Sequence, residues 1–443
     1  MATSTSSGIT VGIDIGTSSV KALAVDDDGE VVARARIPHE FYVPSPLRFE
    51  HDAAQAWHAG PRRALEALGD VQPRAVSVAA MVPSLTAVDG DGVPCTPGLL
   101  YGDERGHGAR VTEIAEAGEL MQFLHWQAKE RPDARGYWMA QAVANHALTG
   151  EPIVSTTVAA TALPLFDWVG WDEALLAECG ARPDQMPTIG VSGRPLAEVR
   201  DRPGCVLEGG TIDALGEQIV AGCDEVGDVL VICGTTLIVW AVVPDAVPVE
   251  HYYTIPHTAP GKFLVGGPSN AGGLFLNWVD NLLDPGDARP ADPGRVPIWV
   301  PYPRGERVPF QDRTRRAQLV DLDLTHDAPA VRRAAFEAAG FVARRMIEAS
   351  PVPARRIVAT GGGTRVEPWI RALADCTRLP VHVCAIPEGG ALGAAFLARV
   401  AAGLETRTND AARWARTSHV VHPDEQWAPA VEERYLRFCD VAG

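Results

Sequence analysis

The stretch that decides the fold runs from Gly12 to Gly29 and reads GIDIGTSSVKALAVDDDG. Apolar residues alternate with small or polar ones on both sides of the Gly-Thr-Ser-Ser segment at 16–19, which predicts two β-strands joined by a tight polar turn. Backbone N–H groups in such a turn converge on an anion, and the hydroxyls of Thr17 and Ser18 add two donors. The stretch therefore predicts a phosphate-binding turn within a hairpin.

Asp14 stands at the end of the first of these strands. A carboxylate cannot bind phosphate itself, so its natural partner is a phosphate-bound cation such as Mg²⁺. The alternative is an ordinary hairpin in which Asp14 caps the turn, and the stretch alone leaves both interpretations open.

The second half of the chain repeats this pattern between Asp228 and Trp240, with Gly234-Thr235-Thr236 as the turn between two apolar strands. The repeat predicts an internal duplication with a boundary near 222–227. A length of 443 residues also suits two domains of roughly 200 residues each. Two similar domains, each with a phosphate-binding hairpin, imply one nucleotide held between them.

Two further stretches are rich in glycine. Asp213 follows Gly-Gly-Thr-Ile at 209–212 and precedes a helix of small residues, so it is either an N-terminal cap or a general base. The glycines at 361–363 end an apolar strand and permit close approach by a flat or phosphorylated ligand, although a plain strand-to-helix turn has the same pattern. Their spacing matches neither a Rossmann fingerprint nor a P-loop.

Charged and aromatic residues elsewhere receive more modest assignments. Asp103 and Arg105 are two residues apart, which favours a local salt bridge, and Tyr101 just before them would wall a pocket. Glu306 and Arg307 lie in a charged loop and are interpreted as structural. The tail at 406–443 receives no assignment.

The composition excludes several classes of protein. A net charge of −17 disfavours nucleic acid or an anionic membrane as a partner. No run approaches the ~20 apolar residues that span a bilayer, and residues 1–7 lack the apolar segment of a signal peptide. The eight cysteines have no C-x-x-C spacing, which favours free thiols in a reducing compartment. We therefore expect a soluble cytoplasmic protein.

The motifs occur in an order that carries a resemblance: Asp14-Ile15-Gly16-Thr17, Gly234-Thr235-Thr236, Gly361-Gly362-Gly363-Thr364-Arg365 and Ala391-Leu392-Gly393-Ala394-Ala395. With this set the chain resembles the FGGY family of carbohydrate kinases from about residue 8 to residue 402. The resemblance implies an α/β fold of two actin-like ATPase (ribonuclease H-like) domains around a central cleft. The N-terminal FGGY domain would span residues 8–224 and bind the sugar. The C-terminal FGGY domain would span residues 225–443 and bind ATP.

The resemblance also implies roles for individual residues. The residues around the ATP phosphates would be Asp14, Gly16, Thr17, Ser18, Gly234, Thr235 and Thr236. The adenosine pocket would be lined by Gly361, Gly362, Gly363 and Thr364, with Arg365 beside it. Asp213 would be the general base, and Mg²⁺ would lie near Asp14 and Asp213. Sugar contacts fall on Met81, Val82, Pro83, Tyr101 and Asp213.

The chain departs from the family pattern at the positions that would read the sugar. Met81-Val82-Pro83 stands where xylulose kinases often have Gln-Met-His and glycerol kinases have Gln-Arg-Glu. Tyr101 replaces the usual tryptophan, and Ala317 and Asp321 replace glycines of the C-terminal signature. These differences disfavour glycerol as the substrate.

The resemblance predicts ATP-dependent phosphorylation of a sugar hydroxyl, with a ketopentose such as D-xylulose as the favoured substrate. D-ribulose or another ketose or polyol is the alternative. A non-catalytic actin-like nucleotide-binding protein is a third reading, against which the retained Asp213 argues. A homodimer is suggested by family habit.

Overall fold

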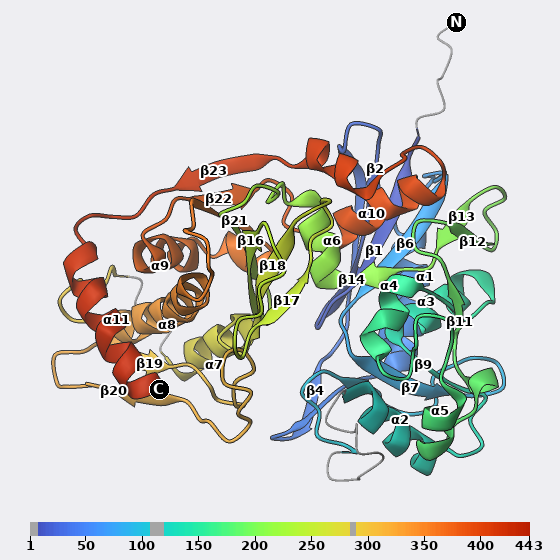
Figure 1. The fold of residues 1–443 in the computed structure, drawn as a ribbon, viewed down its shortest axis with the longest axis horizontal. Coiled ribbons are helices and arrows are strands. Elements are labelled where there is room, and N and C mark those ends of the chain that lie inside the picture. Colours follow the sequence, from blue (N-terminus) through green and yellow to red (C-terminus); the bar gives the residue numbers. More distant parts are fainter. Residues whose placement is uncertain (1–7, 107–118, 284–288) are drawn as a thin grey trace, which may run out of the picture. The chain divides into compact units, whose positions relative to one another are not determined.

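The computed structural model describes residues 8–106, 119–283 and 289–443, and the chain forms two compact units (Figure 1). Unit 1 contains the residues up to Val220 together with Gly389–Trp414, and unit 2 contains Ala221–Glu388 with Ala415–Gly443. This division differs from the single boundary at 224/225 that the sequence suggests, because a late segment returns to unit 1.

Unit 1 is built on a seven-stranded sheet with the hairpin at its centre. Strands β1 (Thr10–Ile15), β2 (Ser19–Val25) and β3 (Val31–Pro38) are antiparallel neighbours. Strand β6 (Ala75–Ala80) runs parallel to β1, and β13 (Val206–Glu208) and β14 (Thr211–Ile212) run parallel to β6. Strand β12 (Pro195–Glu198) closes the edge antiparallel to β13.

The other elements of unit 1 surround this sheet. A second sheet has the order β4 (Tyr42–Ser45), β5 (Arg48–His51), β8 (Gly98–Leu100), β7 (Ser84–Val88), β9 (Gly136–Trp138), and β10 (Ile153–Ser155) pairs with β11 (Thr188–Gly190). The helices are η1 (Ala54–Ala59), α1 (Gly60–Glu66), α2 (Glu119–Glu130), α3 (Ala140–Thr149), α4 (Thr156–Ala159), η3 (Ala160–Ala162), α5 (Glu173–Glu178), η4 (Pro183–Gln185), α6 (Asp213–Val220), α10 (Gly389–Ala401) and η6 (Thr408–Trp414).

Helix α10 belongs to unit 1 because it packs tightly on the central strands (Figure 1). A Cβ atom added at Gly12 in β1 would lie 1.8 Å from the carbonyl oxygen of Ala391, so only glycine permits this approach. A Cβ at Gly393 would lie 2.1 Å from the carbonyl oxygen of Gly216, which brings α10 equally close to α6. The Ala391–Ala395 motif therefore serves the first unit.

Unit 2 has a seven-stranded sheet of matching topology. Its order is β17 (Tyr253–Pro256), β18 (Phe263–Ser269), β16 (Leu237–Val243), β15 (Asp228–Cys233), β21 (Arg356–Thr360), β22 (Val381–Cys384), β23 (Thr417–Val421). As in unit 1, a central antiparallel hairpin is followed by two parallel strands and an antiparallel edge strand. The two units therefore share a sheet topology, which is what an internal duplication would produce.

The helices of unit 2 are α7 (Gly273–Leu282), α8 (Ala328–Glu348), η5 (Gly362–Arg365), α9 (Glu367–Thr377) and α11 (Ala428–Ala442), and β19 (Ile298–Val300) pairs with β20 (Gln318–Val320). The tail thus supplies η6, β23 and α11. Arg434 of α11 reaches the buried Glu337 of α8, with Nε 2.7 Å from Oε2. All eight cysteines are free thiols. Within the described residues, each helix is too short or too polar to cross a membrane.

Candidate active site

The turn between β1 and β2 has the predicted form. The N–H of Gly16 donates to the carbonyl oxygen of Ser19 at 3.1 Å and closes the turn. Asp14 and Lys21 lie opposite one another in the hairpin register, and Lys21 Nζ is 3.1 Å from Asp14 Oδ2. Asp14 Oδ1 is buried without a hydrogen-bond partner. Sequence reasoning missed this ion pair, although counting the hairpin register across the turn would have found it.

A histidine packs behind this turn. The Nε2 of His51 is 2.9 Å from the carbonyl oxygen of Thr17, and the indole N–H of Trp57 donates to His51 Nδ1 at 3.0 Å. These contacts fix the tautomer that donates from Nε2. Burial is the largest cause of the lowered pKa of His51, about 3, and the neighbouring His39 adds to it. The imidazole is therefore neutral at physiological pH and anchors the turn.

The carboxyl ends of three parallel strands bring the predicted residues of unit 1 to one edge. Asp14 in β1 and Thr211 in β14 both pair with Ala79 of β6, from opposite sides. Two strand spacings place their Cα atoms about 10 Å apart. Asp213 follows two residues after Thr211, and Met81 follows directly after β6. Ligands bind at this edge of open α/β sheets.

Asp213 is the first residue of α6 and is half-buried. Its Oδ1 accepts a hydrogen bond from the N–H of Ala214 at 2.7 Å, so it takes part in starting the helix. The strand before it is fixed by Gln141 on α3, whose amide donates to the carbonyl oxygens of Ala80 and Thr211, each at 3.1 Å. The structure thus holds Asp213 firmly at the sheet edge, while its role as a base stays a prediction.

The amino end of α10 lies at the same edge. A Cβ at Gly390 would lie 3.2 Å from both Cγ and Oδ1 of Asp14. The first turn of a helix carries a partial positive charge, which favours the carboxylate there. Sequence reasoning placed this helix in the second domain, because the packing that brings it to Asp14 joins residues far apart in the chain.

The predicted sugar contacts differ in their surroundings. Met81 is buried, whereas Val82, Pro83 and Tyr101 are half-buried. The predicted salt bridge is confirmed: Arg105 donates to the fully buried Asp103 through Nε at 2.9 Å and Nη2 at 2.6 Å.

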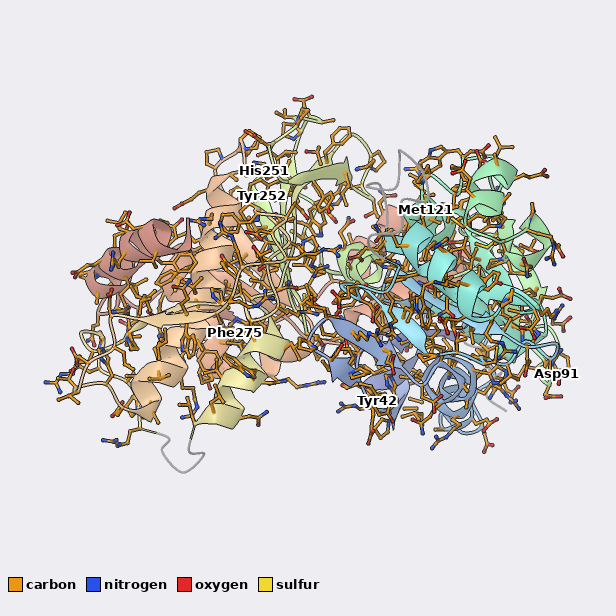
Figure 2. All side chains as sticks on the ribbon, turned by 90° about the horizontal axis from the view of Figure 1, so that it is seen from below. Tyr42, Asp91, Met121, His251, Tyr252 and Phe275 are labelled. Atoms are coloured by element: carbon orange, nitrogen blue, oxygen red, sulfur yellow. The ribbon has the colours of Figure 1, made fainter. Side chains whose placement is uncertain are left out.

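The second predicted turn, at Gly234–Thr236, joins β15 to β16. The N–H of Gly234 donates to the carbonyl oxygen of Thr236 at 3.2 Å. Helix α7 begins against it, because Gly273 N–H donates to Gly234 O at 2.8 Å and Leu274 N–H donates to Thr235 O at 3.0 Å. Phe275 of α7, labelled in Figure 2, is buried in the unit 2 core.

The glycine turn after β21 lies beside this second turn. Ile232 of β15 pairs with Thr360 of β21, and a Cβ at Gly361 would lie 2.9 Å from the carbonyl oxygen of Cys233. Gly361 has φ +90°, a conformation that favours glycine. Gly362 is exposed with open space around it, and Arg365 pairs with Glu388. Unit 2 therefore brings its two predicted nucleotide-binding segments together.

Metal-ligating side chains do not form a ready cluster in the described residues, where no three His, Cys, Asp or Glu side chains gather around one point. Asp14 nevertheless fits a hard cation, because its buried Oδ1 has no hydrogen-bond partner and carboxylate oxygen is a ligand that Mg²⁺ prefers. A Mg²⁺ ion here would take most of its ligands from phosphate oxygens and water.

Comparison with known proteins identifies the class. The N-terminal domain of the FGGY family of carbohydrate kinases matches residues 9–125, and the C-terminal domain of the same family matches residues 229–402. The chain belongs to the FGGY family of carbohydrate kinases, as predicted. It is therefore a carbohydrate kinase, and family membership implies ATP as the phosphoryl donor.

Individual relatives cover nearly the whole chain. The xylulose kinase of Escherichia coli is 26% identical over 445 residues, which cover 89% of this chain and 90% of that protein. The gluconokinase of Bacillus subtilis is 24% identical, covering 89% and 87%. Ligand-bound xylulose kinase from Lactobacillus acidophilus superposes with a TM-score of 0.79 at 20% identity, covering 98% and 97%. This likeness confirms the predicted fold.

Proposed function

We propose that this protein transfers the γ-phosphate of ATP to a hydroxyl of a ketopentose such as D-xylulose, with Asp213 as the general base. The observation that carries the proposal is the shared edge of β1, β6 and β14, which places the positions of Asp14 and Asp213 on either side of β6. A phosphate-side carboxylate and a second carboxylate for the acceptor are the two groups that this reaction needs.

Asp213 acts on the acceptor. As the sugar oxygen forms its bond to the γ-phosphorus, the bond from that phosphorus to the ADP oxygen breaks, and the hydroxyl proton passes to the carboxylate of Asp213. Gln141 holds the strand before Asp213, so the carboxylate is positioned before the substrate binds. Asp14 and Asp213 would hold Mg²⁺, which supplies charge neutralisation on the phosphates.

D-gluconate is a second candidate substrate, because a gluconokinase matches this chain almost as well as the xylulose kinase does. Met81, Val82 and Pro83 present no charged group to either acceptor. Both D-xylulose and D-gluconate therefore belong among the sugars tested.

The test measures ADP release from Mg²⁺-ATP with D-xylulose, D-ribulose, D-gluconate and glycerol. Asp213→Asn keeps an N-terminal capping oxygen but loses the base, and it should reduce turnover of the preferred sugar by about 10³-fold or more. Asp172→Ala is the matched control: Asp172 caps α5 through Ala174 and Leu175, so its loss should cost about 1 kcal/mol of stability and leave turnover intact.

Near-normal turnover in a folded Asp213→Asn variant would refute the base assignment. Nucleotide binding without turnover on any sugar of the panel would instead favour the non-catalytic reading.

A further inference from the structure

The charged loop at 304–309 lies against the second turn. Glu306 is 2% exposed and gathers three donors: the hydroxyl of Ser269 at 2.6 Å, the N–H of Asn270 at 2.8 Å and the N–H of Arg307 at 2.6 Å. Ser269 ends β18, and Asn270 leads into α7. Glu306 therefore ties the loop to the two elements that flank the second turn.

This arrangement directs Arg307 to the turn itself. Its Nη2 is 3.2 Å from the hydroxyl oxygen of Thr236, the last residue of the turn. The side chain is half-buried, and its backbone is fixed by Glu306. A guanidinium held in one place suits phosphate, which it binds through two parallel hydrogen bonds.

The predicted nucleotide residues of unit 2 otherwise offer little positive charge. They are glycines and threonines except for Arg365, whose side chain is exposed and paired with Glu388. ATP carries several negative charges on its phosphates, so a cation near the second turn would lower the free energy of binding. Arg307 is a cation placed at that turn.

We infer that Arg307 is a phosphate-binding residue that places its positive charge against the phosphates of ATP at the Gly234–Thr236 turn. The inference rests on the proposed function only in assigning phosphate to this turn. It replaces the structural role that the sequence suggests for Arg307, and it makes Glu306 a positioning residue for that loop.

The experiment compares the affinities of AMP, ADP and ATP for wild type, Arg307→Lys and Arg307→Gln, by calorimetric titration with EDTA present. A residue that contacts the β- and γ-phosphates affects ADP and ATP but not AMP. Arg307→Gln should weaken ATP and ADP about 10-fold or more and leave AMP within about 2-fold. Arg307→Lys keeps the charge, so its affinity for ATP should lie between those of wild type and Arg307→Gln.

Arg315→Gln is the matched control. Arg315 belongs to the same connecting segment, but it stacks on Phe310 at 3.5 Å and donates to the carbonyl oxygen of Ala442. Its loss should lower the melting temperature and leave the ratio of AMP to ATP affinity unchanged. If Arg307→Gln does not fold, the same ratio is read from Arg307→Lys.

Equal weakening of AMP and ATP, or unchanged ATP affinity in the Arg307 variants, would overturn the inference. The readout is independent of phosphoryl transfer. A wild type that binds ATP but phosphorylates no sugar would refute the proposed function and leave the role of Arg307 standing.

Discussion

The turns at Gly16–Ser18 and Gly234–Thr236 have the same backbone plan, but different charged side chains lie beside them. Each joins the two central antiparallel strands of its sheet, and each has a helix beginning next to it. Beside the first turn lies the carboxylate of Asp14, with Lys21 as its partner. Beside the second lies the guanidinium of Arg307.

The two turns therefore suit different ligands. A carboxylate at the first turn suits a cation, and a guanidinium at the second suits the phosphates themselves. The supports behind the turns also differ, because a neutral histidine holds the first and a buried carboxylate fixes the loop at the second. The two units thus share a backbone plan at the turn and differ in the charged side chains beside it.

The largest expected effect comes from the charge at the first turn. Asp14→Asn removes the carboxylate with little change in shape, and we expect turnover to fall roughly 10²- to 10³-fold because the proposed cation site is lost. Affinity for ATP in EDTA should stay equal or rise, since a negative charge near phosphate is removed. Kinetics as a function of Mg²⁺ and titration without it measure the two effects.

Asp26→Asn is the control for this change. Asp26 directly follows β2, at the end of the hairpin away from the turn, and its Oδ1 accepts from the N–H groups of Asp28 and Glu30. Turnover in Asp14→Asn within a few-fold of wild type would remove the contrast between the two turns.

The glycines behind the turns should differ next. A Cβ at Gly272 would lie 2.4 Å from Leu237 N and from Thr236 C, both backbone atoms of the second hairpin. A Cβ at Gly390 would lie 3.2 Å from the Asp14 carboxylate, a side chain that can shift slightly. We expect Gly272→Ala to lower stability by about 2 kcal/mol or more and to weaken ATP binding.

Gly390→Ala should keep the stability within about 1 kcal/mol and mainly raise the Mg²⁺ concentration needed for half-maximal turnover. Thermal melts and Mg²⁺ titrations separate the two variants. Equal destabilisation of both would mean that α10 is held as rigidly by the first turn as α7 is by the second.

Local patterns were enough to predict the parts of the molecule that depend on neighbouring residues. Both hairpins follow from alternating apolar residues around short polar turns, and the start of α6 at Asp213 follows from the small residues after it. The salt bridge between Asp103 and Arg105 joins residues two apart, so it too could be predicted from the sequence. Each of these features is determined by residues close together in the sequence.

Long-range packing decided what the sequence did not reveal. Helix α10 joins unit 1 because Gly12 and Gly393 allow backbones far apart in the chain to approach closely. Residues 136–138 form β9 instead of extending α3, because they pair with β7. The sequence around Arg307 is that of an ordinary charged loop, and its contact with Thr236 joins residues far apart in the chain.

The support behind the second turn should respond to rising pH. Burial raises the pKa of Glu306 from 4.5 to about 7, so its contribution to stability is fully present below pH 4.5 and is lost as the pH rises through about 7. One pKa unit corresponds to about 1.4 kcal/mol, so wild type should lose about 2 to 3 kcal/mol through this group between pH 5 and pH 8. Glu306→Gln should show a flatter profile in urea unfolding. If the variant lost stability with pH as steeply as wild type, the pKa of the buried Glu306 carboxyl would not be raised.

The support behind the first turn should respond in the opposite direction, with the smallest effect. His51 has a pKa lowered from 6.5 to about 3, so the unfolded chain binds a proton that the folded chain does not, and stability falls as the pH drops below 6.5. Between pH 6.5 and pH 5 the loss in the free energy of unfolding amounts to about 2 kcal/mol.

Gln at this position can still donate to the carbonyl oxygen of Thr17 and accept from Trp57, but it does not titrate. His51→Gln should therefore be less sensitive to acid and keep its turnover, whereas His51→Ala should lose both the titration and the anchor of the turn. If His51→Gln lost stability on acidification as steeply as wild type, the two supports would not differ in their response to pH, and the acid sensitivity of unit 1 would have to come from other buried histidines such as His39.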